Sequence, residues 1–489
     1  MKMTFVKEVT LYQYRYLVGY IVIVVLLLGL LMLGLDQAPR GLTKDEMDSA
    51  VTSINVNVFN PIVTNVVDAP YHILQKVSIH YLGLSPTAIK LPSIVIGVMT
   101  GFGIILMLQK WFRKNVAIIT ALIIVTSTGF LGIARTGTPL IMTAFWTVML
   151  LWGATHVLHA EKHTFIWKLF CFVSIALLAY SPFGIYPLLV MVIAGVFHPH
   201  VRNRLKQGVW WHHTVSVFAI LLVIGPLLAA VIHTPSIGMQ LLGLDKLNEF
   251  QWQQFIPNAI STFDNLFNFT NNSSNLIATP MFSIATTILL LLGLLKLFTA
   301  SYSARSYMLF IWIVLLFVVL TLRPDMLLLV IVPATLILAI GMETLIRLWY
   351  DLFPRNPYAR IAALIPLGIL LISIVDINIE RYFYGYHYSP LTSEFHPELP
   401  AVRNSLSSRQ LGKTNPVVLS VPASQASFYN ILHREYPKLT VNTDPSSSTL
   451  PIIVLNDTKP QLENKTPTQI ITNDLSKEDQ AVLLRVYSK

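Results

Sequence analysis

Long apolar stretches are the feature that most constrains how this chain can fold. A helix needs roughly 20 mostly apolar residues to cross the hydrocarbon core of a membrane. Stretches that approach this length and composition are 17–35, 86–108, 116–133, 139–158, 165–180, 183–198, 214–233, 281–299, 306–322, 325–345 and 360–378. The pattern predicts an all-α polytopic membrane protein with about eleven transmembrane helices.

The composition agrees with this interpretation. Of the 489 residues 54% are hydrophobic and 12% are charged, whereas a soluble protein carries about 25% charged residues. The net charge of +10 lies mainly in short loops between spans, so we expect no nucleic-acid partner. The first apolar stretch is longer than a signal-peptide core and is followed by Asp36 rather than by a cleavage site, so it is interpreted as a retained span.

The loop charges predict an orientation. Cytoplasmic loops are enriched in Lys and Arg, and the richer side carries Lys2, Lys7, Arg15, Lys110, Arg113, Lys114, Lys162, Lys168, Arg202, Arg204, Lys206, Arg305, Arg347, Arg355 and Arg360. We therefore expect a protein integral to the plasma (cytoplasmic) membrane, with a cytoplasmic N-terminus and an extracytoplasmic C-terminus.

Two parts are expected along the chain. Residues 1–378 form the transmembrane domain, including an outer loop 36–85 with interfacial helices that begin near Thr43 and Tyr71, and an outer loop 234–280. Residues 379–489 contain strand-like runs at 417–421 and 452–455 and helical patterns at 424–435 and 477–486. This alternation predicts a small extracytoplasmic α/β domain.

Acidic side chains follow the first span. Asp45 and Glu46 open a predicted helix, and Asp48 shares a helical face with Asp45. Thr43-x-x-Glu46 is a capping-box pattern, in which Glu46 returns a hydrogen bond to the Thr43 backbone. Capping is the structural interpretation of Glu46, and Asp45 remains available for chemistry.

Further motifs follow in order along the predicted outer side. The first is Asp68-Ala-Pro-Tyr71-His72, and the next is Lys90-Leu-Pro-Ser at the start of a span. Arg135-Thr-Gly-Thr-Pro and Arg323-Pro-Asp are two later turns before spans.

This order of motifs resembles the GT-C superfamily of integral membrane glycosyltransferases, in particular the branch with protein O-mannosyltransferases and lipid A aminoarabinose transferases. The resemblance covers roughly residues 1–380 and rests on the order of the motifs, because none of them is specific alone. It implies inverting transfer of a sugar from a polyprenyl-phosphate donor to an extracytoplasmic acceptor, which could be a protein, a lipid or a cell-envelope glycan.

The implied chemistry assigns roles to these residues. A carboxylate deprotonates or orients the acceptor, with Asp45 as the first choice and Glu46 beside it. Cations stabilise the departing phosphate; these are Arg135 and Arg323, with Lys76 and Lys90 weaker because lysines at the interface commonly snorkel. The residues expected to support the acceptor or the local structure are Asp48, Asp68, Tyr71 and His72.

One departure from the family pattern leaves alternatives open. Many members carry a second acid at the turn before the fourth span, and here Arg135-Thr-Gly-Thr-Pro has none. Such a protein could use Glu46 or Asp68 in place of the missing acid, or it could be a catalytically degenerate relative that binds a lipid phosphate or scaffolds an envelope complex. A lipid or solute transporter is a third hypothesis, which the lack of a central acid in any predicted span disfavours. No metal site is predicted, and a divalent metal requirement is left open.

Overall fold

The computed structural model describes residues 15–35, 40–57, 66–159, 164–197, 202, 210–245, 251–267, 279–299, 304–352, 357–388, 395–408, 411–443, 451–455, 466–472 and 482–487. The chain forms two compact units. The helical unit comprises Met1–Leu33, Ser93–Arg135 and Leu140–Gly385, and the sheet unit comprises Gly34–Pro92, Thr136–Pro139 and Tyr386–Lys489.

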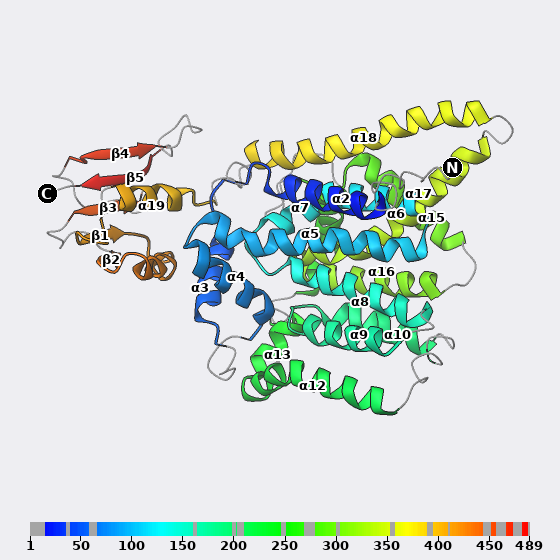
Figure 1. Ribbon diagram of the computed structural model, residues 1–489, viewed down its shortest axis with the longest axis horizontal. Helices are drawn as coiled ribbons and strands as arrows, with labels where there is room; N and C mark the ends of the chain where they lie inside the picture. Colours follow the sequence, from blue (N-terminus) through cyan, green and yellow to red (C-terminus); the bar gives the residue numbers. More distant parts are fainter. Residues whose placement is uncertain are drawn as a thin grey trace, which may run out of the picture. The chain divides into compact units, whose positions relative to one another are not determined.

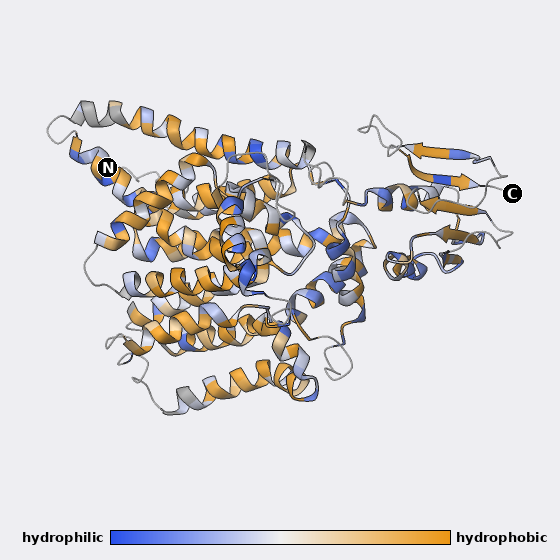
Figure 2. Ribbon diagram, turned by 180° about the vertical axis from the view of Figure 1, so that it is seen from behind, coloured by the Kyte–Doolittle hydropathy of each residue, from blue (hydrophilic) through white to orange (hydrophobic). Residues whose placement is uncertain are grey.

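The helical unit is built from long apolar helices, and Figure 1 shows many of them running alongside one another. Orange, apolar positions extend along their length in Figure 2. Its elements are α2 (Arg15–Met32), α5 (Pro86–Trp111, which begins in the sheet unit), α6 (Lys114–Thr126), α7 (Thr128–Arg135), α8 (Ile141–His159), α9 (Thr164–Leu178), α10 (Ile185–Phe197), α12 (Trp210–His233), α13 (Pro235–Leu242), η2 (Trp252–Gln254), α14 (Phe255–Phe267), α15 (Ile284–Thr299), α16 (Ala304–Leu322), η3 (Pro324–Val330), α17 (Ile331–Leu352) and α18 (Pro357–Tyr388).

The predicted count of eleven spans needs correction. Within the described ranges, four helices are long and apolar enough to cross a membrane: Pro86–Trp111, Ile141–Leu158, Thr214–His233 and Met326–Leu352. A fifth span results if Lys114–Thr126 and Thr128–Arg135 are counted as one, although they meet at a bend of 66°. Other apolar helices of 10–17 residues are Leu17–Met32, Phe165–Leu178, Ile185–Phe197, Ile284–Thr299 and Ser306–Leu322. Predicted spans such as 183–198 and 281–299 correspond to helices of 13 and 16 residues, because hydropathy records apolar residues and not the length of the helix that they form.

Two helices of this unit approach each other at glycines. A Cβ atom on Gly293 of α15 would collide with the carbonyl oxygen of Ile337, and one on Gly341 of α17 would collide with the carbonyl oxygen of Leu289. Backbones in contact at small residues are a common means of packing helices in membranes, where van der Waals contact drives association. These two positions therefore hold α15 against α17.

The sheet unit combines the loop after the first apolar helix with the tail of the chain. Its elements are α3 (Lys44–Asn55), α4 (Ala69–Leu82), the first residues of α5, α19 (Glu398–Ser408), β1 (Val417–Ser420), α20 (Ala426–Tyr429), η5 (Asn430–Arg434), β2 (Leu439–Asn442), β3 (Ile452–Leu455), β4 (Gln469–Thr472) and β5 (Val482–Tyr487). The strand order is β2-β1-β3-β5-β4. Strand β1 pairs in parallel with β2 and β3, and β5 pairs antiparallel with β3 and β4.

The predicted α/β character of the tail is confirmed, with one error. The strand predictions at 417–421 and 452–455 correspond to β1 and β3, and the helical pattern at 424–435 corresponds to α20 and η5. The last predicted helix was wrong: Val482–Tyr487 is a strand, and 477–481 lie outside the described residues. Its sequence Val-Leu-Leu-Arg-Val-Tyr pairs with strands on both sides, and such tertiary pairing overrides a weak local helix preference.

The helices of the loop share a core with the tail. Met47, Ala50 and Ile54 of α3 belong to the same buried apolar cluster as Leu419 of β1 and Phe428 of α20. The apolar face of α3 is therefore covered by protein. Helix α4, in contrast, leaves an apolar stripe exposed, made of Leu74, Val77 and Tyr81. This stripe supports the prediction that α4 lies in the membrane interface.

Candidate active site

The start of α3 is fixed by a capping box. Thr43 lies before the helix in an extended conformation, and its hydroxyl oxygen accepts the backbone N–H of Glu46 at 3.2 Å. The backbone N–H of Thr43 in turn donates to Oε2 of Glu46 at 2.8 Å. These reciprocal bonds satisfy donors that a helix N-terminus leaves open, so the capping box predicted from Thr43-x-x-Glu46 is confirmed.

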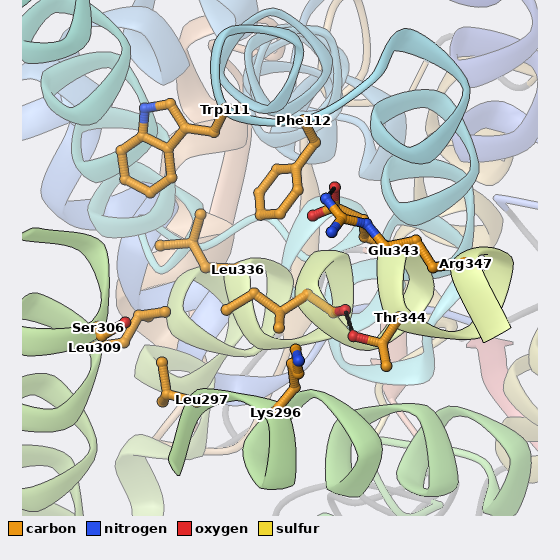
Figure 3. A pocket seen from close by; sticks show the side chains of 11 residues that line it. Trp111, Phe112, Lys296, Leu297, Ser306, Leu309, Leu336, Glu343, Thr344 and Arg347 are labelled. Carbon is orange, nitrogen blue, oxygen red and sulfur yellow. Dashed lines mark hydrogen bonds and ion pairs between the residues drawn. The ribbon is translucent and has the colours of Figure 1, made fainter. Parts of the chain in front are cut away.

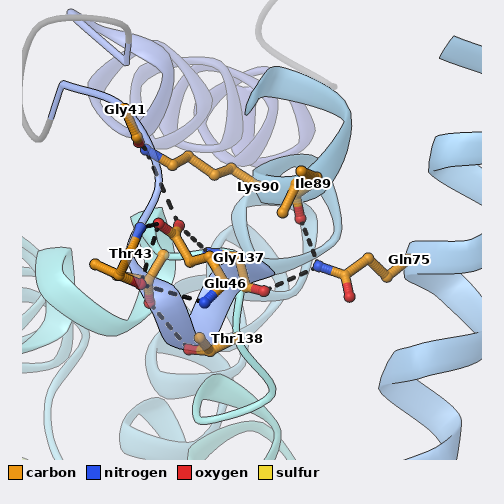
Figure 4. Close-up of polar contacts among 9 residues, drawn as sticks. Gly41, Thr43, Glu46, Gln75, Ile89, Lys90, Gly137 and Thr138 are labelled. Carbon is orange, nitrogen blue, oxygen red and sulfur yellow. Dashed lines mark hydrogen bonds and ion pairs between the residues drawn. The ribbon is translucent and has the colours of Figure 1, made fainter. Parts of the chain in front are cut away.

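The Glu46 carboxylate also holds a distant turn. Its Oε1 atom accepts the backbone N–H of Gly137 at 2.6 Å, and Nζ of Lys90 lies 4.0 Å from the same oxygen (Figure 4). Lys90 donates to the carbonyl of Gly41 at 2.9 Å. The side chains of Glu46 and Lys90 are 0% and 1% exposed. Both carboxylate oxygens are thus engaged with backbone groups, which makes Glu46 a structural anchor.

A buried glutamine holds the same turn from α4. Nε2 of Gln75 donates to the carbonyls of Gly137 at 2.9 Å and Ile89 at 3.0 Å. Its Oε1 atom accepts from the hydroxyls of Ser49 at 2.9 Å and Ser53 at 2.5 Å. An amide has two donors and two acceptor positions, and Gln75 uses all four. Sequence reasoning missed this residue; the available signal was a polar side chain on the helical face that carries His72.

Space at the turn demands glycine at position 137. A Cβ atom there would lie 2.5 Å from Cγ2 of Ile89 and 3.0 Å from its carbonyl oxygen. The neighbouring hydroxyls of Thr136 and Thr138 lie 3.2 Å apart. The segment Thr136–Pro139, which connects α7 to α8, is therefore held by contacts with Glu46, Gln75 and Ile89.

His72 extends the buried network of α3 and α4. Its Nδ1 atom lies 2.8 Å from the hydroxyl of Ser53. Burial lowers the pKa of the imidazole to about 4, because removal from water disfavours the charged form. His72 is therefore neutral near pH 7 and acts as a hydrogen-bonding member of the core.

Asp68 and Tyr71 form the beginning of α4. Asp68 is the residue before the helix, with a left-handed φ of 53°, and is 7% exposed. Tyr71 is 0% exposed, and its ring meets that of His72 edge-on with centroids 5.8 Å apart. Both predicted support residues are thus placed in the interior of the sheet unit.

Asp45 and Asp48 differ from Glu46 in exposure. Both aspartates lie on α3 with exposed side chains, and neither forms an ion pair within the described part of the chain. Asp45 belongs to the first helical turn, where an acidic side chain interacts favourably with the positive end of the helix dipole. The first turn of α3 therefore presents one buried carboxylate and one exposed carboxylate.

The two lysines predicted as weaker phosphate ligands contact the main chain. Lys76 of α4 donates from Nζ to the carbonyl of Val56, at the end of α3, at 2.8 Å. Lys90 donates to Gly41 as described above and is 0% exposed. Both ammonium groups thus connect segments of the sheet unit, and their role toward a phosphate stays a prediction.

Arg135 lies in the interior of the helical unit. It is 0% exposed and donates to the carbonyl of Leu30 at 3.3 Å. Its guanidinium lies over the rings of Tyr382 and Phe383, 5.2 and 5.0 Å from their centroids. Cation–π contact of this kind stabilises a desolvated guanidinium. The two aromatic partners, on α18, gave no signal in the sequence.

Arg323 lies at the end of α16 in a partly open setting. It pairs with Asp245 at 2.8 Å, donates to the carbonyl of Gly243 at 3.0 Å and lies over the ring of Phe183 at 5.4 Å. Its side chain is 13% exposed and that of Asp245 is 39% exposed. Phe183 has a left-handed φ of 60°, which is rare for a bulky residue. Arg323 is therefore held in place by an ion pair, a carbonyl group and an aromatic ring.

The described residues offer no metal site. No group of three or more His, Cys, Asp or Glu side chains in these ranges lies close enough together to hold an ion.

Comparison of the fold with solved structures gives several matches. ArnT from Cupriavidus metallidurans bound to undecaprenyl phosphate superposes with a TM-score of 0.52 at 14% identity, over 97% of this chain and 98% of ArnT. The Archaeoglobus fulgidus oligosaccharyltransferase matches in its apo form with a TM-score of 0.53 at 14% identity, over 89% of this chain and 65% of the other. The same archaeal enzyme, AglB, in complex with an inhibitory peptide and a dolichol-phosphate matches with a TM-score of 0.50 at 14% identity, over 88% and 65%.

At the level of sequence alone the comparisons give nothing: no protein-family model and no curated protein matches the chain. The present chain spans nearly the whole of ArnT and about two thirds of the archaeal enzyme. ArnT is a lipid A aminoarabinose transferase, and both proteins are GT-C glycosyltransferases. The chain therefore has the GT-C fold, the fold of these membrane glycosyltransferases.

Proposed function

We propose that this protein is a membrane glycosyltransferase that moves a sugar from a polyprenyl-phosphate donor to an acceptor outside the cytoplasmic membrane. The observation that carries the proposal is the likeness of fold to ArnT over nearly the full length of both chains. The ArnT structure holds undecaprenyl phosphate and the AglB structure holds a dolichol-phosphate. A lipid-linked phosphate is therefore the donor class that the fold favours.

Asp45 is the proposed catalytic base. The acceptor hydroxyl oxygen bonds to the anomeric carbon, while the bond from that carbon to the donor phosphate oxygen breaks. The hydroxyl proton passes to the Asp45 carboxylate, and the polyprenyl phosphate leaves with the bonding electron pair. A single displacement of this kind inverts the anomeric configuration. The leaving phosphate is a stable anion, so the reaction requires a base but no separate acid.

Arg323 is the better supported of the two arginines for the phosphate. Nη1 of Arg323 donates to Asp245 and to the carbonyl of Gly243, and these contacts fix the guanidinium in place. Its side chain is partly exposed, whereas Arg135 is 0% exposed and packed against two aromatic rings. We assign Arg323 to the donor phosphate and expect Arg135 mainly to stabilise the helices around it.

The decisive experiment compares two aspartates one helical turn apart. The purified protein is incubated with radiolabelled undecaprenyl-phosphate pentose or hexose and a membrane extract as acceptor. Asp45→Asn should lower the transfer rate by about 100- to 10,000-fold, the usual contribution of a general base. Asp48→Asn changes an exposed residue of the same helix that we expect only to support the acceptor, so it should retain most of the transfer rate when the acceptor is in excess. Unimpaired transfer by Asp45→Asn would refute the assignment of the base.

The proposal also includes the orientation of the protein in the membrane. A cytoplasmic N-terminus and an external tail would place the sheet unit beside the outer leaflet. Cys171 is the single cysteine, so Cys171→Ser provides a background for placing one thiol at exposed Lys413 or exposed Lys110. A membrane-impermeant maleimide applied to intact cells should label the thiol at position 413 and leave that at 110 unlabelled. The opposite pattern would reverse the orientation.

A non-catalytic relative is the second candidate. It is favoured by the turn Thr136–Pro139, which carries no acid, and by the engagement of Glu46 with backbone groups. Such a protein would bind undecaprenyl phosphate but release no product. Any labelled product formed by the purified wild-type protein would exclude it. Flux of labelled lipid across sealed vesicles without sugar transfer would instead support the transporter hypothesis.

A further inference from the structure

A cavity of about 160 Å³ lies in the helical unit, and none of the residues assigned to transfer lines it. It is formed where helices end or begin. Trp111 is the last residue of α5, Lys296 lies in the last turn of α15, and Ser306 lies in the first turn of α16. Arg347 projects into it from the second half of α17. Figure 3 shows Trp111 and Phe112 on one side and Lys296 and Leu297 on the other.

The charged lining of the cavity favours an anion. It contains two cations, Lys296 and Arg347, and one carboxylate, Glu343, which leaves one net positive charge. Glu343 accepts from Nη2 of Arg347 at 2.6 Å and thereby orients the guanidinium, whose side chain remains 64% exposed. Lys296 is exposed and forms no ion pair with any described residue. Its ammonium group is thus available to a ligand.

The remaining lining combines hydroxyls with an apolar wall. Ser306 and Thr344 offer hydroxyl groups beside the cations, and the apolar side chains include Leu309 and Leu336. The indole N–H of Trp111 donates to the Thr155 hydroxyl at 2.9 Å, which fixes its ring. Tryptophan near the end of a membrane helix is typical of the headgroup region. Ligand pockets for whole small molecules measure roughly 300–1,000 Å³, so this cavity fits a headgroup rather than a complete nucleotide sugar.

We propose that this cavity binds the phosphate group of an anionic phospholipid such as phosphatidylglycerol, at the end of the helical unit that the loop charges assign to the cytoplasm. Lys296 and Arg347 contact the phosphate, the hydroxyls of Ser306 and Thr344 contact its remaining oxygens or the glycerol, and Trp111 borders the acyl chains. Basic pockets between membrane helices on the cytoplasmic side are common sites for anionic headgroups. The site is independent of the proposed transfer reaction and uses none of its residues.

The test measures lipid binding by the full-length protein. Native mass spectrometry of the purified protein, titrated with phosphatidylglycerol or phosphatidylcholine, gives the apparent Kd of each lipid. We expect Lys296→Gln to weaken phosphatidylglycerol binding roughly fivefold, and Lys296→Gln with Arg347→Gln roughly 25-fold. Lys110→Gln is the matched control: Lys110 is exposed in the last turn of α5 but does not line the cavity. It should change the Kd by less than a factor of two, and phosphatidylcholine binding should be unaffected by all three.

A parallel titration with inorganic phosphate distinguishes binding of a lipid phosphate from binding of a soluble phosphate ligand. If phosphate alone raises the unfolding temperature and Lys296→Gln removes that rise, the cavity binds phosphate from a soluble ligand. If only phosphatidylglycerol binds in a Lys296-dependent manner, the ligand is the lipid. Equal losses in Lys296→Gln and Lys110→Gln would show non-specific attraction and overturn the proposal, as would unchanged binding in the double variant. Unfolding temperatures of the variants report whether each remains folded.

Discussion

Replacement of Glu46 by glutamine tests whether this carboxylate anchors two segments or merely caps α3. Glutamine retains one acceptor oxygen and presents an NH₂ group where the second oxygen was. One of two buried N–H groups, that of Thr43 or that of Gly137, would then face a donor instead of an acceptor. Loss of a hydrogen bond to a charged group costs about 1.5–3 kcal/mol. The buried Lys90 ammonium would also lose its nearby opposite charge, so we expect a total of about 3–5 kcal/mol.

If Glu46 served only as part of the capping box, its replacement would lower the free energy of unfolding by much less. Loss of a cap costs about 0.5–2 kcal/mol, so the two interpretations differ measurably. For a cooperative unit of 150–250 residues, 1 kcal/mol shifts the unfolding temperature by about 2–4 °C. The intrinsic fluorescence of the detergent-solubilised protein should therefore report a decrease in unfolding temperature of about 6–20 °C for Glu46→Gln. Asp45→Asn, one residue earlier and exposed, should leave the transition nearly unchanged. If both variants behaved alike, the anchoring role derived from Gly137 would be wrong.

Two further predictions concern the same region. Gly137→Ala should lower stability by about 1–3 kcal/mol, because the added methyl group meets Ile89. Gly225→Ala, where the added methyl group meets no atom within 4 Å, is the matched control and should not lower stability in the same unfolding assay. His72 should make stability depend on pH. Its pKa of about 4 in the folded protein lies below the ordinary histidine pKa of about 6.5. The unfolded chain therefore binds more protons between these values, and stability falls as the pH drops from 6.5 to 4. The full loss in the free energy of unfolding is about 3 kcal/mol. This loss should be absent in His72→Gln. If the stability of the wild-type protein and that of His72→Gln depended on pH in the same way, the prediction would be wrong.

The sequence predicted correctly those elements whose formation depends on residues close together in the chain. The Thr43-x-x-Glu46 pattern identified the start of α3, because a capping box is formed by residues three positions apart. Alternation and apolar runs identified β1 and β3 in the tail. The final strand, Val482–Tyr487, was mistaken for a helix because its pairing partners β3 and β4 lie elsewhere in the chain. The short strands β2 and β4 were missed for the same reason.

The contacts that determine the roles of the candidate residues are mostly long-range. Glu46 and Gly137 are separated by 91 positions, and Gln75 and Gly137 by 62. The sequence pattern within one segment cannot predict a hydrogen bond to a segment so far away in the chain. The grouping of residues 34–92 with the tail was equally invisible, because the sequence suggested a division in chain order near residue 378. The apolar face of α3, which indicated a membrane surface, is instead covered by the core of the sheet unit.

Asp45 is exposed and Glu46 is buried. This difference bears on whether catalysis needs the second acid that is missing from the turn before the fourth predicted span. Successive residues of an α-helix point about 100° apart, so one carboxylate of the pair is directed into the protein and the other outward. Asp68, the other acid considered as a substitute, is 7% exposed and precedes α4 in the interior. Neither buried acid is positioned to replace a second catalytic carboxylate. If the protein transfers a sugar, Asp45 is the carboxylate of the first outer loop best placed to act as base, and one base is sufficient when the leaving group is a phosphate that needs no proton.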